Sequence, residues 1–172
     1  MKIRQERADD YSEVYELVKK SFATSSHSDG TEADYLNEVR GRDTFIPELS
    51  LVVENEDGMI VGQIVLYKTD IHSPERKYTE LLLSPICVHP DFFCQGIARK
   101  MMEEAFRIAK DMGFSIVFLC GNPDFYRKFG FRPTYEYRVF HIHDESKRAE
   151  WCMALELTVG ALSNINGTIN IN

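Results

Sequence analysis

The amino-acid sequence predicts a single α/β (α+β) domain over residues 1–172, in which helices flank a mixed, mostly antiparallel central sheet of about seven strands. Three observations lead to this fold class. The segments follow the order strand, two helices, three strands, helix, strand, helix, two strands. The pair Asp57-Gly58 joins two apolar β-branched runs, as in an antiparallel hairpin. The run at residues 78–88 is almost continuously apolar, as in a strand at the centre of a sheet.

The first forty residues predict one strand and two helices. Residues 3–6 form a short candidate strand. Residues 9–22 carry apolar side chains at helical spacing, and residues 31–39 repeat that spacing over a shorter length. Residues 24–30, between the two helices, are rich in Ser and predict a loop.

Three strands are expected next. Residues 49–54 and 59–67 are the arms of the hairpin, and residues 78–88 follow as the buried strand. Pro85 lies inside this third strand. Because proline has no backbone N–H to give to a ladder, we expect the strand to bulge or splay there.

The clearest helix of the sequence follows His89-Pro90. It is expected to begin near Gln95 and to stop at Gly113. Its apolar side chains recur at helical spacing and predict one buried stripe. That stripe consists of Ile97, Met101, Ala105, Ile108 and Met112.

The last third of the chain predicts shorter elements. Residues 114–120 form a buried strand, and residues 124–129 form a brief helix that ends at Gly130. Residues 132–143 and 149–157 predict two further strands. The tail, residues 163–172, is rich in Asn and Gly and fits either a loose hairpin or a frayed end.

Composition excludes several classes of protein. The formal net charge of −7 argues against a nucleic-acid partner, which needs a basic face, and is compatible with a cationic amine. The four cysteines are widely spaced, so they indicate neither a zinc site nor a disulfide framework. The first residues lack the apolar core of a secretory signal, and no run is long and apolar enough to span a membrane. We therefore expect a cytoplasmic protein without a metal.

The turn before the long helix has the features of a phosphate-binding site. The first N–H groups of a helix have no partner within the helix, and the helix dipole adds partial positive charge, so this end can bind a pyrophosphate. Gly96 and Ala98 have small side chains that would let phosphates approach these N–H groups. Arg99 and Lys100 add positive charge. Taken alone, however, a small residue at a helix start is common.

With its neighbours, this turn resembles the acetyl-CoA loop of the GCN5-related N-acetyltransferases (GNATs), whose pattern is Gln/Arg-x-x-Gly-x-Gly/Ala. Gly96 and Ala98 match the last two fixed positions, whereas Phe93 stands where the family usually has Gln or Arg. The resemblance implies the acyl-CoA N-acyltransferase fold, acetyl-CoA as acetyl donor, and a fourth strand that is bulged and splayed from the fifth. The acetyl-CoA-binding residues it implies are Ile86, Cys87, Val88, Phe93, Cys94, Gln95, Gly96, Ile97, Ala98, Arg99, Lys100, Asn122, Phe125 and Phe129.

A second segment resembles the late Tyr-x-x-x-Gly-Phe pattern of the same family, with Tyr126, Gly130 and Phe131 at the matching places. Helical spacing would put Phe125 and Phe129 on one face, packed inward, with Tyr126 beside them. The version of this segment found here, Gly-Asn-Pro-Asp-Phe-Tyr, is similar to that of the YhbS-type subgroup of predicted acetyltransferases.

The resemblance implies direct attack of a primary amine on the thioester in a ternary complex. Tyr126 is the candidate general acid toward the departing sulfur, and the alternative is a buried tyrosine with a satisfied hydroxyl. Glu80 is the candidate base acting through water, although an exposed charge near a strand start fits it at least as well. Glu54 and His72 also stay open as bases. Backbone N–H groups near residues 86–88 are expected to bind the thioester carbonyl.

Three other side chains have weaker claims to a chemical role. Cys94 lies near a helix N-terminus, which can lower a thiol pKa, but a small loop residue is a better interpretation than an acyl-enzyme nucleophile. His141 and His143 would share one strand face, yet no third metal ligand is apparent. We interpret both histidines as structural or solvent-facing.

Two other functions fit the same residues. One is a non-catalytic acyl-CoA-binding or protein-interaction module on this fold, and the other is a domain that binds a different phosphorylated ligand at the same helix end. The expected partner is a small-molecule amine or a peptide amine, and the candidate acceptor segments are residues 21–42 and 68–77. The resemblance is also compatible with a homodimer.

Overall fold

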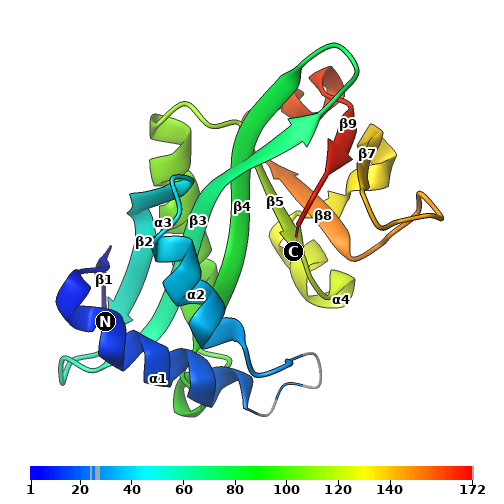
Figure 1. The fold of residues 1–172 in the computed structure, drawn as a ribbon. Helices are drawn as coiled ribbons and strands as arrows, with labels where there is room; N and C mark the ends of the chain where they lie inside the picture. The colour runs from blue at the N-terminus through cyan, green and yellow to red at the C-terminus, as the bar shows by residue number, and fades with distance from the viewer. Residues whose placement is uncertain (24, 26–27, 172) are drawn as a thin grey trace. The chain divides into compact units, whose positions relative to one another are not determined.

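The computed structural model, drawn as a ribbon in Figure 1, describes residues 1–23, 25 and 28–171. The chain divides into two compact units. Unit 1 comprises Met1–Tyr67 and Leu83–Ile108, and unit 2 comprises Lys68–Leu82 and Ala109–Asn172. Three elements continue from one unit into the other: β3 (Ile60–His72), β4 (Lys77–Val88) and α3 (Ile97–Asp111). The predicted loop at residues 24–30 includes positions 24, 26 and 27, which lie outside the described residues.

Unit 1 contains an antiparallel set of strands at the start of the chain. Its remaining elements are β1 (Lys2–Gln5), η1 (Ala8–Asp10), α1 (Tyr11–Phe22), α2 (Glu32–Arg40), β2 (Phe45–Glu54) and η2 (Pro90–Phe92). β1 pairs with β2, and β2 pairs with β3. The predicted hairpin is confirmed: the N–H of Asn55 donates to the oxygen of Met59 at 2.9 Å, and Gly58 takes the positive φ of 81° that the turn requires.

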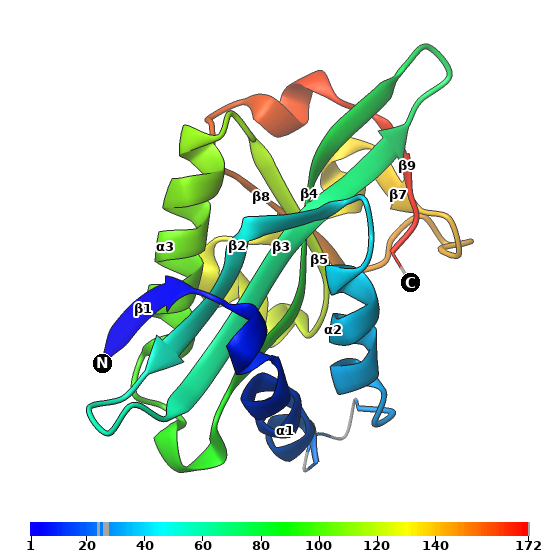
Figure 2. The same ribbon diagram turned by 60° about the vertical axis from the view of Figure 1, so that its left-hand side comes forward.

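Helices cover both faces of the strands in unit 1. Figure 2 shows α3 on one side of β2 and β3, and α1 and α2 on the other. The approach of α3 is close, because a Cβ added at Gly62 of β3 would lie 3.1 Å from the side chains of both Ile97 and Met101. The predicted apolar spacing of α1 and α2 is largely confirmed: Val14, Leu17, Val18, Leu36 and Val39 are buried, and so is Ala33. Phe22 and Tyr35, which the same spacing includes, are half-buried.

The prediction for α3 was partly wrong. The helix begins at Ile97 rather than near Gln95, and its buried stripe is Ile97, Met101, Met102, Ala105 and Ala109. Ile108 is only half-buried, and Met112 lies beyond the helix end with 45% of its surface exposed. Ala109 belongs to the buried stripe because it lies on the i, i+4 row that runs from Ile97 through Met101 and Ala105.

Unit 2 is built around a short strand that has partners on both edges. Its elements are β5 (Ile116–Cys120), α4 (Pro123–Tyr126), η3 (Arg127–Phe129), β6 (Arg132–Pro133), η4 (Thr134–Tyr137), β7 (Val139–His141), β8 (Cys152–Glu156), η5 (Ala161–Asn164) and β9 (Gly167–Ile169). β5 is parallel to β4 and antiparallel to β8, which also pairs with β6. β9 pairs with β3 and β7.

The pairing of β4 with β5 is short, as the predicted splay requires. It covers Leu81–Val117 and Leu82–Phe118, whereas β5 pairs with β8 along its full length. The Ser84–Pro85 peptide bond, which follows on β4, is cis. The predicted fold class, a mixed and mostly antiparallel sheet flanked by helices, is confirmed, with nine strands in the described residues rather than about seven.

Two predictions for the end of the chain were wrong. The single strand expected at residues 132–143 is broken by η4 and by Arg138, whose φ is 59°. A residue in this left-handed region is not extended, so it interrupts the strand. The tail is neither a loose hairpin nor frayed over its described part, because β9 places Ile169 opposite Ile71 and buries it completely. No helix in the described part of the chain is long and apolar enough to cross a bilayer.

Candidate functional site

In unit 1, the end of β4 carries the first candidate residues. Cys87 is buried, while Ile86 and Val88 are half-buried on the opposite face of the strand. The carbonyl of Val88 accepts a hydrogen bond from the Ser21 hydroxyl at 2.8 Å. Burial raises the pKa of the Cys87 thiol to about 12, so this thiol stays protonated at neutral pH.

The turn after β4 is held by His89. Its N–H donates to the oxygen of Val61 at 2.8 Å, and its Nδ1 accepts the N–H of Asp91 at 3.2 Å. Its Nε2 lies 2.9 Å from Nζ of Lys20, at the end of α1. His89 as a whole is 8% exposed. These contacts fix the direction in which the chain leaves β4 and enters η2.

Residues 93–96 form the exposed part of the turn. Cys94 and Gly96 have positive φ values of 60° and 76°, and a Cβ added at Gly96 would meet no atom within 4 Å. The first bond of α3 joins the Lys100 N–H to the Gly96 oxygen at 3.1 Å, so the N–H groups of Ile97 and Ala98 have no i−4 partner inside the helix. Phe93 is 48% exposed. The turn thus presents backbone donors and open space, which together suit an anion.

In unit 2, the second candidate segment begins at Asn122. Its side-chain oxygen accepts the N–H of Asp124 at 2.9 Å and so caps α4, whose first residue is Pro123. Gly130 ends η3 with a φ of 92°, a conformation that favours glycine. The predicted helix at residues 124–129 is therefore a single α turn followed by a 3₁₀ turn.

Tyr126 lies in an aromatic cluster. Its ring centroid is 5.0 Å from that of Phe125 and 5.7 Å from that of the fully buried Phe131, both edge to face. Within the described residues, no hydrogen bond of its hydroxyl to another residue is found. Burial raises the pKa of Tyr126 to about 12. The phenol is therefore protonated at neutral pH and can donate a proton.

The prediction that Phe125 and Phe129 pack inward together was partly wrong. Their ring centroids are 5.1 Å apart, so the two rings do pack against each other. Phe129 is half-buried, but Phe125 is 40% exposed. Because α4 is only four residues long, it is too short to bury a whole face.

Glu80 of β4 is half-buried and bound to backbone. Its Oε2 accepts the N–H groups of Ser115 and Ile116 at 3.0 and 3.1 Å, at the start of β5. Burial raises the pKa of Glu80, and the two N–H donors offset part of that rise. The carboxyl is thus better matched to accept a proton near neutral pH than an ordinary glutamate.

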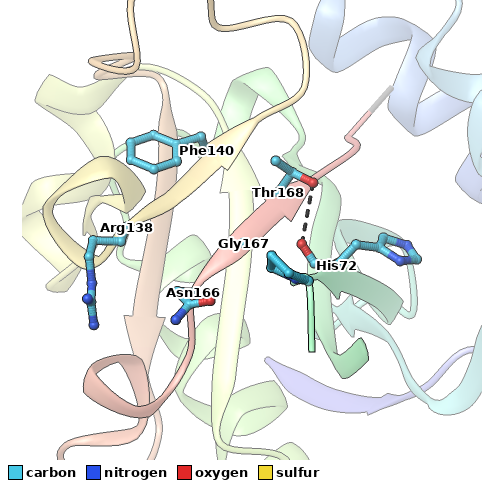
Figure 3. A pocket seen from close by; sticks show the side chains of 7 residues that line it. His72, Arg138, Phe140, Asn166, Gly167 and Thr168 are labelled. Carbon is cyan, nitrogen blue, oxygen red and sulfur yellow. Dashed lines mark hydrogen bonds between the residues drawn. The ribbon is translucent and has the colours of Figure 1, made fainter. Parts of the chain in front are cut away.

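Glu54 and His72, the two alternative candidates for the base, lie in different environments from that of Glu80. Glu54 receives Nε and Nη2 of Arg4 at 2.7 and 2.5 Å, and this contact lowers its pKa, which makes it a weaker base. His72 lines a cavity of about 490 Å³ in unit 2, together with Pro74, Arg138, Phe140, Asn166, Gly167 and Thr168 (Figure 3). In Figure 3 its imidazole points away from Arg138 and Asn166.

The two histidines of the β7 segment hold the tail of the chain. His141 is 6% exposed, and its Nε2 lies 2.9 Å from the oxygen of Ile171. Its Nδ1 accepts the N–H of His143 at 3.1 Å. His141 is thus a structural residue.

Two residues of interest escaped the sequence reasoning. Gly121 lies so close to Tyr126 that a Cβ at this position would overlap the phenol ring. Gln63 of β3 is fully buried, and neither atom of its side-chain amide has a hydrogen-bond partner in the described residues. The Gly-Asn-Pro sequence marked a turn at Gly121, but no local pattern distinguishes Gln63 from a solvent-facing residue of a strand.

The curated proteins that this sequence resembles are described as N-acetyltransferases. The sequence is 26% identical over 131 residues to the uncharacterized N-acetyltransferase YhbS of Escherichia coli K12, over 76% of this chain and 73% of YhbS. It is 27% identical over 128 residues to the uncharacterized N-acetyltransferase YjhQ of the same strain, over 72% of this chain and 65% of YjhQ. The predicted YhbS-type resemblance is confirmed.

Solved structures share the fold. The E. coli YhbS structure in complex with CoA matches with a TM-score of 0.85 and 21% identity, over 99% of this chain and 89% of that one. A GNAT family acetyltransferase from Brucella melitensis in complex with acetyl-CoA matches with a TM-score of 0.77 and 22% identity, over 99% and 95%. The model of the family described as "Acetyltransferase (GNAT) domain" matches residues 2–134. Because this match spans well over half of the chain, the protein belongs to the GNAT family of N-acetyltransferases.

Proposed function

We propose that this GNAT-family protein transfers the acetyl group of acetyl-CoA to a primary amine by direct attack in a ternary complex. The observation that carries the proposal is Tyr126: its phenol has a raised pKa of about 12 and an unpartnered hydroxyl within the described residues, in a segment that matches the family pattern. The acceptor is a small-molecule amine or a peptide amine, which suits a chain of net charge −7.

The proposed donor site uses the turn of unit 1. Acetyl-CoA supplies the activated thioester, and relatives of the same fold were solved with CoA and with acetyl-CoA. The N–H groups at the start of α3 and the open space at Gly96 fit its pyrophosphate. Arg99 and Lys100 add positive charge, and backbone N–H groups near Ile86 are the candidates for the thioester carbonyl.

The proposed proton transfers use unit 2. Tyr126 donates a proton to the departing sulfur, a role worth about 10²–10⁴-fold in general acid catalysis. Glu80 accepts the proton of the amine through water, and its raised pKa supports this role. Since Oε2 of Glu80 already accepts two backbone N–H groups, its other oxygen is the one we assign to the water. We also propose that residues 1–172 act as one acetyltransferase domain.

The test is turnover of acetyl-CoA against a panel of amines. Tyr126→Phe should lower kcat about 10²-fold or more at saturating substrate, with little change in the KM for acetyl-CoA. Tyr135→Phe is the matched control, because the Tyr135 hydroxyl binds Glu150 at the surface, and it should keep the parent kcat. An unchanged kcat in Tyr126→Phe would refute the general-acid role.

Two further measurements separate the alternatives. Glu80→Gln should remove the acidic limb of the pH profile of kcat/KM, whereas Glu75→Gln, an exposed control, should leave it. Calorimetric titration should give tighter binding for acetyl-CoA than for ATP or NAD. Binding of CoA without turnover of any amine would instead favour the non-catalytic module.

A further inference from the structure

Cys120 and Cys152 face each other across two strands of unit 2. They are directly opposite in the antiparallel register of β5 and β8, and both are free thiols. Cys120 is exposed, whereas Cys152 is completely buried. The other free thiols in the described part of the chain are Cys87 and Cys94, and neither lies opposite a cysteine in the strand pairings of that part.

Neighbouring backbone hydrogen bonds show whether Cys120 and Cys152 form a hydrogen-bonded or a non-hydrogen-bonded pair of the antiparallel ladder. The N–H of Gly121 donates to the oxygen of Trp151 at 2.9 Å, so these two residues form a hydrogen-bonded pair. Pair types alternate along an antiparallel ladder, and Cys120 and Cys152, the next pair along, are therefore of the non-hydrogen-bonded type. Such pairs have Cα atoms about 4.5 Å apart, within the range of about 4.4–6.8 Å found in disulfides. A bond between the sulfurs thus needs no change of register.

The two thiols already interact. The pKa of Cys152 is lowered, first by the neighbouring Cys120 thiol and then by the Thr134 side chain. The loss of a second proton from so close a neighbour, together with burial, raises the pKa of Cys120. The pair thus releases its first proton more easily than a lone buried thiol would, as a reactive dithiol must.

We propose that Cys120 and Cys152 are a thiol-oxidation site that forms a reversible disulfide with a low-molecular-weight disulfide such as oxidised glutathione. The Cys152 thiolate takes the proton of Cys120 as the Cys120 sulfur attacks one glutathione sulfur, and the first glutathione thiolate leaves and takes that proton on from Cys152. The buried thiolate of Cys152 then attacks the Cys120 sulfur of this mixed disulfide and releases the second. The two thiol protons pass to the two released thiolates, and two electrons pass from the cysteine pair to glutathione.

Oxidation of this pair should also affect catalysis, because the pair is next to the proposed general acid. This effect on kcat rests on the proposed function. Gly121 follows Cys120 directly and lies against the Tyr126 ring. Forming the bond draws the two Cβ atoms from about 4.5–5.5 Å to about 3.8 Å. The shift displaces Gly121 and with it the phenol, so oxidation lowers kcat by roughly tenfold or more, given that a 1 Å misplacement can cost about 10²-fold.

Trp151 gives a direct readout because it is the single tryptophan of the chain and precedes Cys152. The full-length protein is equilibrated with mixtures of reduced and oxidised glutathione, and the fluorescence of Trp151 is followed. In parallel, free thiols are alkylated and the cross-linked peptide containing Cys120 and Cys152 is quantified by mass spectrometry. We expect both signals to share one midpoint and to return fully with excess reductant.

Three variants complete the experiment. Cys120→Ser and Cys152→Ser should lose the fluorescence transition and the fall in kcat, and Cys120→Ser keeps the test decisive if the buried substitution fails to fold. Cys94→Ser, which removes the exposed thiol of the other unit, should keep the transition. The disulfide signals do not depend on turnover, so they decide the proposal even if no amine is acetylated. Mixed disulfide that accumulates on Cys120 without a cross-link would overturn it, and a cross-link without any change in the kcat of an active preparation would overturn the regulatory role.

Discussion

At the scale of the residue, the state of Tyr126 is set by its neighbours. Phe125 and Phe131 surround the ring, and the desolvation they cause is the reason for its raised pKa. Gly121 completes this environment from the backbone side. The position of the Tyr126 ring thus depends on the absence of a side chain at residue 121.

Gly121→Ala should displace the Tyr126 ring, because the added methyl would overlap Cε2 and lie 2.9 Å from Cδ2. We expect kcat to fall by roughly 10–10²-fold, the cost of a misplacement of about 1 Å, with the KM for acetyl-CoA little changed. Gly41→Ala is the control, since its new Cβ would make only an ordinary contact of 3.5 Å with the Glu38 oxygen. Equal activity of the two variants would contradict the prediction.

Gln63→Leu should stabilise the protein. The amide of Gln63 is fully buried and unpartnered within the described residues, and an unsatisfied buried polar group costs about 1–3 kcal/mol. Urea unfolding should therefore show a rise of that order in the free energy of unfolding. Gln5→Leu, an exposed position on β1, should change it by less than about 0.5 kcal/mol. A less stable Gln63→Leu would mean that the amide is hydrogen-bonded in solution.

At the scale of the element, α2 is tied to the strands of unit 1 by a buried ion pair. Nη2 of Arg40 lies 2.5 Å from Oε1 of Glu6, with side-chain exposures of 5% and 1%. The Ser50 hydroxyl donates to Oε2 of Glu6 at 2.8 Å, and the guanidinium lies 4.0 Å from the centre of the Tyr11 ring. The carboxylate of Glu6, in the segment after β1, thus links Arg40 of α2 to Ser50 of β2.

Glu6→Ala should destabilise the protein by about 3–5 kcal/mol, because it leaves the buried charge of Arg40 without its partner. The free energy of unfolding in urea measures this. Glu38→Ala removes a surface pair, with 3.6 Å to Arg42 and exposures of 71% and 40%, and should cost at most about 1 kcal/mol. Similar losses in both variants would contradict the assignment of a buried pair.

A second arginine predicts how stability depends on pH. Arg4 donates to Asp10 at 2.6 and 2.9 Å and to Glu54, and these hydrogen bonds lower the pKa of both carboxyls. The folded state therefore holds fewer protons than the unfolded state in acid. The stabilisation is present above the unfolded pKa values, about 4 for both groups, and is lost as pH falls below them.

Arg4→Met should flatten this dependence. Urea unfolding at several pH values between 6 and 3 should show a smaller loss of stability toward acid in the variant than in the parent chain. Lys19→Met removes an exposed pair with Glu16 at 4.0 Å and should keep the parent slope. If the stability of Arg4→Met fell with pH as steeply as that of the parent chain, other carboxyls would govern acid unfolding.

At the scale of the whole molecule, the two units share their central elements. β3, β4 and α3 each continue from one unit into the other, so neither unit has a complete set of strands of its own. Elements shared in this way couple the folding of both parts of a chain.

The two units should therefore unfold in one transition. Ile169→Ala removes a fully buried side chain of β9 in unit 2 and should cost about 2–5 kcal/mol. The fluorescence of Trp151 reports on unit 2, and far-UV circular dichroism reports largely on α1, α2 and α3. Both signals should shift to lower temperature together. A shift of the fluorescence alone would show that the units unfold independently.

Local signals made much of the fold predictable. The Asp57-Gly58 turn, the apolar spacing in α1 and α2, and the helix after residue 96 all depend on neighbours within a few positions. The elements that were wrong depend on distant partners. β7 and β9 are three residues each, and they form because each pairs with a strand far away along the chain.

The candidate site divides in the same way. The sequence by itself determined the family, through the Gly96 turn and the Tyr126 segment, because both patterns are local. The first depends on the free N–H groups at the start of a helix, and the second depends on a helix that ends at a glycine. Only the tertiary structure decided that Gly121 abuts Tyr126, that Gln63 is buried without a partner, and that Cys120 meets Cys152. These facts depend on strand register and on the face that each side chain takes, and a shift of one residue in register would reverse them.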